Sequence, residues 1–338
     1  MNEPLVSVLV LNYNGLEHLK ECFDSLLNLK YQNLELIFID NQSQDDSVKF
    51  MKENYKKVKI IELDKNYGFA QGNNIGMAHT NGEYIALLNM DTIVDENWIT
   101  ELVKVAQKSE KTGIVGGKFY HYDNKEIVGF AGSSSDKFGN LRQFGDLKKE
   151  RGLFDFEMKA FFITGAGFLF KREVYNKIGL FDSRYYLYYE DVDFCWRAWI
   201  SGYDVIYTPK AIIYHKPDLK REFEKSLKIR SWIEKFRLRT LLKNYELKNL
   251  FKILPNYFFQ KSVNLYQYRK QKKGIISSLL IIYLKAIFWN LIHIFSLIKE
   301  RIFVQANRLR GDDFIFRLME ELQELEMKLI ASTKYKKN

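Results

Sequence analysis

The stretch VSVLVLNYNGLEHLKECFDSLLNLKYQNLELIFID, residues 6–40, decides the fold class of this 338-residue chain. Its two ends, VSVLVLNY and LELIFID, are short apolar runs, as in strands that are buried on both faces. Between them, apolar residues at helical spacing predict one face of an amphipathic helix: Leu16, Leu19, Phe23, Leu26 and Leu27. The order strand, helix, strand predicts a parallel βαβ unit.

Two more apolar runs continue this pattern. KIIEL (residues 59–63) and YIALLN (residues 84–89) predict a third and a fourth strand. We therefore expect an α/β fold with a Rossmann-like, mostly parallel central sheet. Ligands of such sheets bind beyond the carboxyl ends of the strands, where this chain carries the polar stretches NYNG, DNQSQDDS and NMD.

The common phosphate-binding loops are missing from the sequence. The first strand is followed by Asn-Tyr-Asn-Gly instead of G-x-G-x-x-G, and G-x-x-x-x-G-K-[ST] does not occur. Gly68, Gly72 and Gly76 fall four residues apart, a spacing that favours close helix packing over a phosphate loop. Packing does not explain the three asparagines beside them: Asn66, Asn73 and Asn74.

Composition indicates a folded protein in a reducing compartment. The chain is 46% hydrophobic and 28% charged, which excludes a disordered chain. Cys22 and Cys195 cannot form a disulfide framework and lack metal-ligand spacing. The apolar run at residues 6–11 follows Glu3 and no basic segment, so we interpret it as a strand and expect the chain to begin in the cytosol.

The net charge of +10 is concentrated in the last third of the chain. Residues 1–215 hold 25 Lys and Arg against 30 Asp and Glu, whereas residues 216–338 hold 27 against 12. We expect an α/β catalytic domain over residues 1–225 and a basic, hydrophobic helical region over residues 226–338. Such asymmetry indicates a polyanionic partner, either nucleic acid or an anionic membrane surface.

Two acidic patterns are candidates for chemistry. Asn89 and Asp91 end the fourth strand; they either open a turn or hold a divalent cation against a nucleotide diphosphate. Glu190, Asp191 and Asp193 follow the aromatic run at residues 185–189. They are either first-turn acids favoured by a helix dipole or part of a sugar-binding cleft, which the aromatic run favours.

The ordered motifs resemble those of the family 2 glycosyltransferases of the GT-A fold, and in particular the rhamnosyltransferase-like branch. They are VSVLVLNYNG, IDNQSQDDS, NYGFAQGNNIG, EYIALLNMDT, TGAGFLFKREVYNKIGLFD and YYEDVDFCWRAWISGYDVIYTPKAIIYH, with RLRTLLKNY near the end of the match. The match covers roughly residues 5–245. The resemblance implies an inverting transferase with a dTDP- or UDP-sugar donor, a divalent metal (Mg²⁺ or Mn²⁺) and a single displacement. The branch favours dTDP-rhamnose.

The resemblance also implies roles for the donor-binding residues. Asp40 matches the acid that accepts a hydrogen bond from the pyrimidine base. Asn12, Asn14 and Asn41 lie near the nucleoside in this correspondence, and Asn73 matches the asparagine of the Gly-rich segment. Asn89 stands where many relatives have the first acid of a D-x-D motif, which leaves one charge fewer for the metal.

The remaining roles concern the metal and the reaction. Asp91 matches the last acid of D-x-D and is expected to bind the metal, with His215 as a further ligand. Asp191 matches the general base, and Glu190 is placed to orient the acceptor hydroxyls. A retaining hydrolase is disfavoured, because its two carboxylates must flank the bond at about 5 Å, which adjacent residues rarely achieve. A non-catalytic sugar-nucleotide-binding protein and a nucleic-acid-binding protein remain as alternatives.

The tail predicts contact with a membrane. Residues 274–298 are nearly all apolar but include Lys285, Asn290 and His293, so we favour interfacial helices over a span. Basic residues flank this segment, as expected beside anionic lipid: YRKQKK (residues 268–273), Lys299, Arg301, Arg308 and Arg310. The alternative is a helical subdomain that packs on the core or on a second subunit, which leaves a homo-oligomer open.

The last helical segment, FIFRLMEELQELEMKLI (residues 314–330), has an apolar face that suits a partner helix or a cover for the apolar surface of residues 274–298. The apolar tail argues against nucleic acid as a partner. We expect an enzyme at the cytoplasmic face of the cell membrane, peripheral or monotopic. Its acceptor would be lipid-linked or a polysaccharide in cell-surface glycan synthesis.

Overall fold

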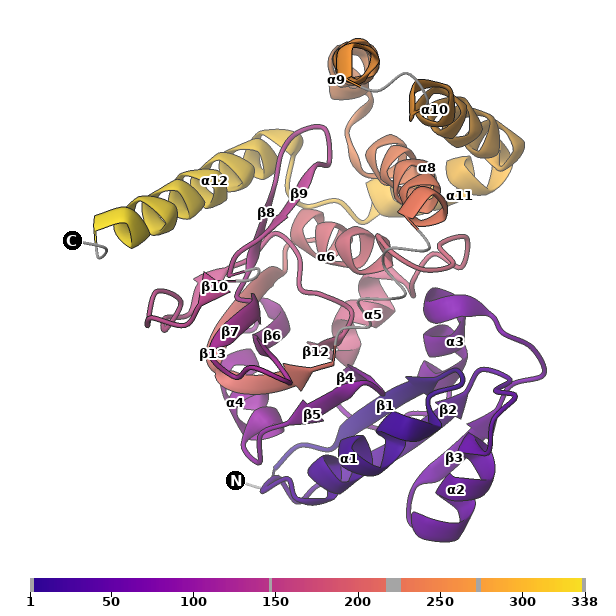
Figure 1. Cartoon of the computed structure of the whole chain (residues 1–338), viewed down its shortest axis with the longest axis vertical. Coiled ribbons are helices and arrows are strands. Elements are labelled where there is room, and N and C mark those ends of the chain that lie inside the picture. Colours follow the sequence, from indigo (N-terminus) through magenta and orange to yellow (C-terminus); the bar gives the residue numbers. More distant parts are fainter. Residues whose placement is uncertain (1–2, 146–147, 217–225, 272–274, 336–338) are drawn as a thin grey trace.

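The computed structural model of the chain describes residues 3–145, 148–216, 226–271 and 275–335 (Figure 1). The strands are β1 Val6–Asn12, β2 Leu34–Asp40, β3 Lys59–Glu62, β4 Tyr84–Asn89, β5 Thr92–Val94, β6 Thr112–His121, β7 Ile127–Phe130, β8 Ser133–Ser135, β9 Leu141–Gln143, β10 Lys148–Lys149, β11 Met158–Lys159, β12 Gly167–Lys171 and β13 Asp204–His215. The helices are α1 Leu16–Leu27, α2 Ser47–Asn54, α3 Gly68–Met77, α4 Trp98–Ala106, α5 Arg172–Ile178, α6 Glu190–Ile200, α8 Ser226–Asn244, α9 Leu247–Gln271, α10 Ile275–Ile292, α11 Ile294–Ala306 and α12 Asp312–Tyr335.

The first half of the chain forms the predicted parallel layer. Strands β3, β2, β1 and β4 lie side by side in this order and all run in one direction. Asn12 of β1 lies opposite Asp40 of β2, and Leu11 lies opposite Asn89 of β4. The four predicted strands are confirmed, and their polar ends meet at one edge of the sheet.

The prediction of a mostly parallel sheet is wrong, because the second half of the sheet is mixed. β12 inserts between β4 and β6 and is antiparallel to both. β7 is antiparallel to β6, and β5 and β11 are antiparallel to β13, whereas β6 and β13 are parallel. Alternating strands and helices up to residue 89 predict parallel neighbours, but the chain reaches β12 through a long excursion of hairpins and not through a βαβ crossover.

The glycines of α3 serve close packing, as their spacing predicts. A Cβ atom at Gly76 would lie 2.0 Å from Ile39 Cδ1, and one at Gly72 would lie 2.9 Å from Leu11 Cδ1. Any side chain there would push the helix off β1 and β2. In α1 the predicted apolar face is buried at Leu19, Phe23 and Leu26, but Leu27 is 55% exposed.

The C-terminal helices pack onto the α/β layer and onto one another. α8 lies against α6 and carries α10 and α11 on its other side (Figure 1). α12 runs separately along β8, and its apolar face is buried at Ile315, Leu318, Met319 and Leu322. α12 therefore covers the core at β8 and α6, and the interpretation that it covers the apolar surface of residues 274–298 is wrong.

The apolar segment at residues 274–298 is broken into two helices. In the part of the chain that the structure describes, no single helix is long and apolar enough to cross a membrane. The pair Leu279–Ile292 and Ile294–Ala306 meets that requirement by length and composition, but its two helices are bent by 75°. The flanking basic run YRKQKK (residues 268–273) lies outside the described residues and side chains.

The arginines after this segment face inward, which corrects the prediction that they meet lipid. Arg301 Nη1 donates to the backbone oxygens of Leu242 (2.6 Å) and Tyr245 (2.7 Å) at the end of α8. Arg310 Nη2 lies 2.8 Å from Asp204 Oδ1. Arg308 in turn donates to the Asn244 backbone oxygen and to Asp312 Oδ1. These guanidinium groups cap helix carbonyls, a use that a basic sequence run does not reveal.

Candidate active site

The ends of β1 and β2 form a polar corner around Asp40. Asp40 is 4% exposed and accepts hydrogen bonds from Asn12 Nδ2 (3.1 Å) and from the Ser43 backbone N–H (2.8 Å). Asn12 Nδ2 also donates to Ser43 Oγ (3.0 Å), whereas Asn12 Oδ1 is buried and receives no hydrogen bond from any described residue. An ionised carboxylate has about four acceptor positions, so Asp40 keeps capacity for a further N–H donor.

The loops that flank this corner are fixed by Asn14. This residue adopts the left-handed conformation with φ 52°, which asparagine tolerates better than most residues. Its backbone N–H donates to Ser43 Oγ (2.9 Å), and its Oδ1 accepts from the Gln44 backbone N–H (2.6 Å). Asn14 therefore ties the loop after β1 to the loop after β2. The sequence predicts it near the nucleoside but does not reveal this cross-link or the part of Ser43.

Asn41 makes the corresponding link to α3. Its Nδ2 donates to Asn66 Oδ1 (3.1 Å), and its Oδ1 accepts from the Tyr67 backbone N–H (2.9 Å). Asn73 lies inside α3, 1% exposed, with its Nδ2 on the Phe69 backbone oxygen (3.0 Å). The contacts that Asn41 and Asn73 make are therefore internal, and their contact with a nucleotide stays a prediction.

Asp91 and His215 lie together because the strands beside them, β5 and β13, pair with each other. β5 begins directly after Asp91 and pairs with the end of β13, with Thr92 opposite His215. This pairing places Asp91 Oδ1 3.3 Å from His215 Nε2. The two residues are far apart in the sequence, and the structure confirms that they meet.

The chemistry of this pair fits a divalent cation. Asp91 Oδ1 is buried and receives no hydrogen bond from the described residues, so a carboxylate oxygen is left for another partner. No group of three or more His, Cys, Asp or Glu side chains within the described ranges is arranged to hold a metal. A cation at Asp91 and His215 would therefore need further ligands from water and from a bound phosphate, as Mg²⁺ commonly has. Asn89 precedes this pair at the end of β4, partly buried.

The segment Gly165–Ala166 joins this end of the site to the acidic pair of α6. The Gly165 backbone N–H donates to Asp191 Oδ2 (2.8 Å). The next carbonyl, that of Ala166, accepts the Asn89 backbone N–H (2.9 Å). Two adjacent residues thus hold the candidate base and the strand end that precedes Asp91 in register. Gly165 was missed as a site residue, although the sequence TGAG before β12 is a signal for close backbone approach.

Burial sets the protonation of the two adjacent acids. It raises the pKa of Asp191 to about 6, although hydrogen bonds from the Gly165 and Val192 backbone N–H groups act in the opposite direction. Glu190 is 4% exposed, and its Oε2 has no hydrogen-bond partner among the described residues. Burial first, and the neighbouring Asp191 charge second, raise the pKa of Glu190 well above its usual range. Asp191 is therefore the member of the pair that is ionised near neutral pH.

A strained turn presents these acids to the site. Tyr188 and Tyr189 both have φ 73°, in the left-handed region that bulky residues rarely adopt. Such residues cost about 1–3 kcal/mol each and cluster at functional sites. Tyr189 is held by the hydrogen bond from its hydroxyl to the Gly139 backbone oxygen (2.6 Å). The sequence shows the aromatic run but not its conformation, because nothing in Tyr-Tyr predicts positive φ.

The third acid of the run, Asp193, belongs to the core and not to the site. It is fully buried, and its Oδ2 accepts from Arg197 Nε (2.8 Å) and from Lys243 Nζ of α8 (2.9 Å). Lys243 and Arg239 also donate to Asp182 Oδ2, at 3.0 and 2.7 Å. We call Asp182, Asp193, Arg197, Arg239 and Lys243 the buried ion network. It ties α8 to α6 directly beneath the candidate base.

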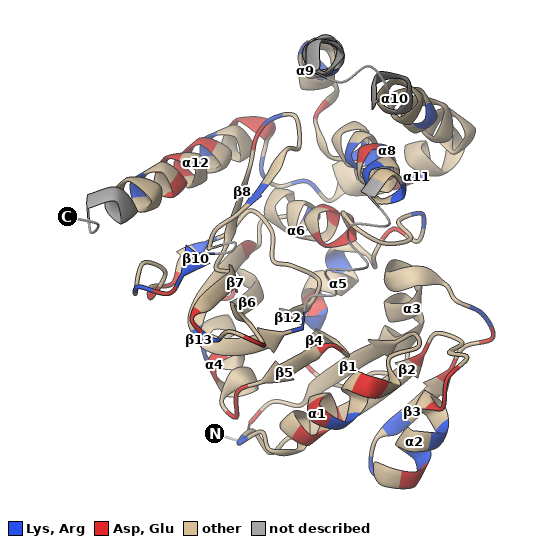
Figure 2. Cartoon of the chain, in the orientation of Figure 1, with Lys and Arg blue, Asp and Glu red and all other residues tan. Residues whose placement is uncertain are grey.

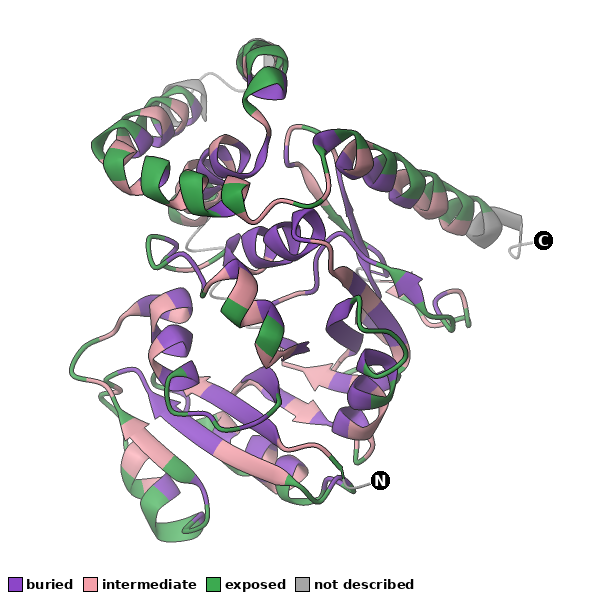
Figure 3. Cartoon of the chain, turned by 180° about the vertical axis from the view of Figure 1, so that it is seen from behind, coloured by how far each residue is buried: buried purple, intermediate pink, exposed green. Residues whose placement is uncertain are grey.

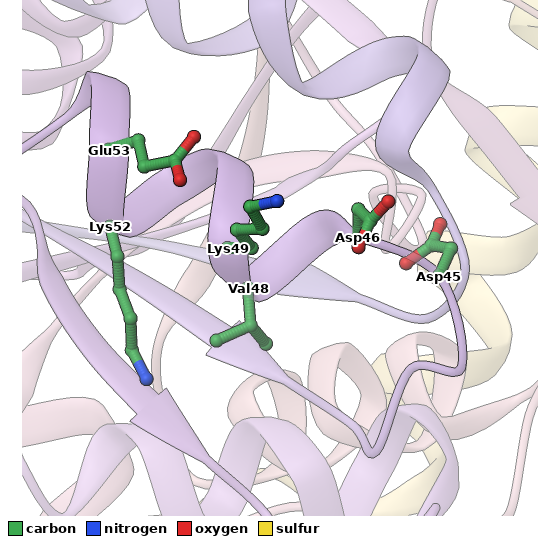
Figure 4. Close-up of a pocket in the computed structure, with 6 residues that line it drawn as sticks. All are labelled: Asp45, Asp46, Val48, Lys49, Lys52 and Glu53. Atoms are coloured by element: carbon green, nitrogen blue, oxygen red, sulfur yellow. The ribbon is translucent and has the colours of Figure 1, made fainter.

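A surface hollow away from the residues described above does not have the features expected of an active site. It is lined by Asp45, Asp46, Val48, Lys49, Lys52 and Glu53 (Figure 4). These residues come from α2 and the turn before it, and none is a candidate catalytic, nucleotide-binding or metal-binding residue. Residues of one helix and its preceding turn do not converge on a bound molecule.

The family model described as Glycosyl transferase family 2 matches residues 7–179, slightly more than half of the chain. The chain belongs to this family. The matched range contains β1 to α5, and with them the polar corner, Asp91 and Gly165. The family that the sequence motifs resemble is thus confirmed, while the rhamnosyltransferase-like branch stays a prediction.

Several curated relatives share this part of the chain. The glycosyltransferase GlyG of Streptococcus pneumoniae serotype 4 is 30% identical over 186 residues, which are 53% of this chain and 61% of GlyG. The poly-beta-1,6-N-acetyl-D-glucosamine synthase of Staphylococcus epidermidis is 26% identical over 212 residues, 62% of this chain and 49% of the synthase. The O-antigen biosynthesis protein RfbC of Myxococcus xanthus is 26% identical over 227 residues, 64% of this chain and 18% of RfbC. The chain therefore spans between about a fifth and three-fifths of the length of these relatives.

Solved structures of glycosyltransferases share the fold of this family 2 chain. GalNAc-T7, solved with UDP, GalNAc and Mn²⁺, aligns with a TM-score of 0.55 and 18% identity, over 76% of this chain and 55% of its own. The mannosyltransferase PcManGT of Pyrobaculum calidifontis, solved with GDP-Man and Mn²⁺, aligns with a TM-score of 0.53 and 15% identity, over 90% and 86%. These alignments confirm the GT-A-like α/β fold.

Proposed function

We propose that the chain is an inverting glycosyltransferase that moves a sugar from a nucleoside diphosphate to a lipid-linked or polysaccharide acceptor in cell-surface glycan synthesis. The observation that carries the proposal is the pair of hydrogen bonds through Gly165–Ala166, which joins a raised-pKa carboxylate, Asp191, to the strand end that precedes Asp91. A base and a cation-binding carboxylate so connected suit a single displacement, in which the two act on opposite sides of one carbon atom.

Asp191 is the general base in this proposal. Its carboxylate takes the proton of an acceptor hydroxyl while that oxygen forms a bond to C1 of the donor sugar. The bond from C1 to the diphosphate oxygen breaks, and its electron pair leaves with the nucleoside diphosphate. Attack from the side opposite to the leaving group inverts C1. A carboxylate with a pKa of about 6 is a stronger base than an exposed aspartate yet is still ionised at pH 7.

Asp91 and His215 are the residues that would hold a divalent cation. When bound, such a cation neutralises the charge that develops on the departing diphosphate. The unsatisfied Asp91 Oδ1 supports this assignment, and so does the Mn²⁺ in the solved structures of GalNAc-T7 and PcManGT. Mg²⁺ and Mn²⁺ both suit this donor set.

Asp40 and Asn12 are the residues that would read the donor base. The N3–H of uracil or thymine is a donor for which the spare acceptor positions of Asp40 are suited. A UDP- or dTDP-sugar therefore fits, and the branch resemblance favours dTDP-rhamnose. The relatives named for O-antigen and poly-N-acetylglucosamine synthesis support a cell-surface glycan as the product.

Isothermal titration tests the donor and the metal together. Wild-type protein and Asp91→Ala would be titrated with UDP, dTDP and GDP, each in Mn²⁺ and in EDTA. We expect binding of the pyrimidine nucleotides in Mn²⁺, weak binding in EDTA, and loss of the metal effect in Asp91→Ala. If folded wild-type protein binds none of the three nucleotides, the proposal is wrong.

A sugar-nucleotide-binding protein without catalysis is the alternative function. It is favoured by Asn89, which leaves one carboxylate fewer at the metal site. Hydrolysis or transfer of a bound UDP- or dTDP-sugar would be compared between wild type and Asp191→Asn. A binding protein would show no turnover in either form, whereas the proposed transferase loses turnover and keeps nucleotide binding.

A further inference from the structure

α10 and α11 present a continuous apolar face that no other described part of the chain covers. We call it the apolar plate. Its members are large side chains between 46% and 84% exposed: Leu280, Ile281, Leu284, Phe288, Leu291, Ile292, Phe295, Ile298 and Ile302. On α10 they lie on one side of the helix, while Leu279, Ile282, Ala286 and Asn290 are buried on the opposite side. Figure 3 shows exposed residues along the outer sides of both helices.

The plate continues across the bend between the two helices. Leu291 and Ile292 end α10, and Phe295 and Ile298 follow directly on α11. The helices meet at 75°, so the plate follows the outer surface of the molecule on two sides of α8. Exposed apolar patches larger than a few hundred Å² mark interaction sites in soluble proteins.

The helix α12 of the same chain serves as a comparison, because its apolar face is covered by other residues. Its apolar residues Ile315, Leu318 and Leu322 are at most 3% exposed. The helix is held by hydrogen bonds from Gln323 Nε2 to the Ser135 backbone oxygen (2.7 Å) and from Ser134 Oγ to Glu326 (3.2 Å). The plate has the same type of residues without such a counterpart, so its partner lies outside the described chain.

The charges beside the plate favour an anionic partner. Lys285 and Lys299 are exposed on α10 and α11. In residues 275–306 the sequence contains a single acid, Glu300. Figure 2 shows α10 and α11 almost free of acidic residues, in contrast to α12. Lysines at the edge of an apolar face are the pattern of a helix that lies in the interface of a membrane with anionic lipid.

A hollow next to the plate also suits hydrocarbon. It measures about 130 Å³ and lies between α8, α9, α10 and α11. Its lining is apolar apart from Asn290, whose Nδ2 already donates to the backbone oxygens of Lys235 (3.0 Å) and Ala286 (2.9 Å). A methyl or methylene group can fill the apolar part of such a space, but the buried Asn290 Oδ1 has no hydrogen-bond partner among the described residues and would stay unpaired.

We propose that the apolar plate docks this protein on an anionic bilayer surface, with α10 and α11 lying in the interface. A second copy of the chain is the rival partner, but a two-fold interface would bring the lysines of both copies together with one acid from each. The inference does not rest on the proposed glycosyltransferase activity, since it concerns surface chemistry alone.

The plate lies one helix layer away from the candidate site. Trp289 of α10 packs on Phe236 of α8 (ring centroids 5.6 Å apart), and Phe236 packs on Tyr185 (5.0 Å) in the turn before Glu190. Helix layers are about 10 Å thick, so the docked site would lie roughly 20 Å from the lipid surface. Under the proposed function, this distance suits an acceptor whose sugar is attached to a lipid headgroup.

Vesicle co-sedimentation of the full chain tests the docking. The probes are vesicles of phosphatidylcholine alone and of phosphatidylcholine with phosphatidylglycerol, at low and high salt, without nucleotide or acceptor. We expect binding to the anionic vesicles that weakens with salt. The double variant Phe288→Glu/Phe295→Glu should reduce partitioning about a hundredfold or more, because two largely exposed phenyl groups no longer enter the lipid. Lys285→Glu/Lys299→Glu should abolish the preference for anionic lipid.

Leu27→Glu is the matched control. Leu27 is 55% exposed on α1, far from the plate in the fold, and its replacement should leave partitioning unchanged. As a second measurement, Phe295→Cys would be labelled with a polarity-sensitive dye; Cys22 and Cys195 are buried and should not react. Its emission should shift to shorter wavelength when anionic vesicles are added.

Three outcomes would overturn the inference. Wild-type protein could stay in the supernatant with every vesicle, or the Phe288→Glu/Phe295→Glu variant could bind like wild type. Finally, sedimentation equilibrium could show a dimer that this variant abolishes, with no binding to vesicles. That last result would make the plate a subunit interface.

Discussion

Two aspartates of α6, Asp191 and Asp193, are separated by one residue and have opposite surroundings. Asp193 is fully buried and accepts hydrogen bonds from Arg197, Lys243 and Asn244. Within the described ranges, Asp191 has no cationic partner and accepts from two backbone N–H groups, those of Gly165 and Val192. The first is a structural charge, and the second is a carboxylate whose surroundings suit the general base that we propose.

The comparison teaches that partners, not burial alone, decide what a buried acid does. Burial raises the pKa of Asp191 to about 6 because no positive charge among the described residues opposes it. Burial would also raise the pKa of Asp182 in the buried ion network, but the charges of Lys243 and Arg239 bring it well below the usual range. The chain thus keeps Asp182 ionised through its cationic partners, whereas Asp191 has the raised pKa that suits the proposed general base.

The largest expected effect concerns the rate of sugar transfer, and it distinguishes Asp191 from Asp193. In Asp191→Asn we expect sugar transfer to fall about 10²–10⁴-fold, because the acceptor hydroxyl loses its base. Binding of UDP in Mn²⁺ should be unchanged, as measured by titration calorimetry. The raised pKa means that the folded state disfavours the ionised form at pH 7, so the neutral variant should be as stable as wild type or more stable. An active Asp191→Asn enzyme would remove Asp191 from the mechanism.

The next largest effect concerns the free energy of unfolding, and it also distinguishes Asp193 from Asp191. Asp193→Asn removes the negative charge that pairs with the buried Arg197 and Lys243. We therefore expect a loss of about 3–5 kcal/mol in the free energy of unfolding. Urea unfolding followed by circular dichroism would measure it, with Asp191→Asn as the matched control. A loss below about 1 kcal/mol would mean that the buried ion network does not hold α8 to α6.

The pH dependence should separate activity from folding. The base must be ionised, so the rate of transfer should fall about tenfold per pH unit as the pH drops below about 6. Asp182 has a lowered pKa, so its stabilising contribution is present above the ordinary aspartate pKa of about 3.9 and is lost in more acidic solution. At pH 5 we therefore expect a folded protein whose rate of transfer is about tenfold lower than at pH 7. Parallel loss of rate and of circular dichroism between pH 7 and 5 would contradict this.

The smallest expected effect concerns Asn89, which stands where many relatives have the first acid of a D-x-D motif. Asn89→Asp would add a unit charge at the strand end that precedes Asp91, worth about 1 kcal/mol in a solvated site, or about fivefold in Mn²⁺ affinity. Titration of Mn²⁺ followed by electron paramagnetic resonance would measure it, and Asn97→Asp would control for added surface charge. Unchanged affinity would place Asn89 outside the reach of the cation.

Much of the fold and part of the site follow from local sequence. The apolar runs of β1 to β4 and the glycine spacing of α3 predict their structures because period and residue size act locally. Asp91 and Asp191 are recognisable from the residues around them. The direction of β12 is not, since it depends on which strands the chain passes before it enters the sheet.

The sequence by itself determined the α/β class, the family and the polar strand ends, because hydrophobic period and motif order are properties of neighbouring residues. Tertiary structure decided which charged side chains lie at the candidate site or on the surface and which only stabilise the fold. Asp193, Arg301 and Arg310 look as available in the sequence as Asp191 and Lys299, but the first three are turned inward to partners that are distant in the sequence. A buried charge must find its partner across the fold, and that pairing is a property of the folded chain alone.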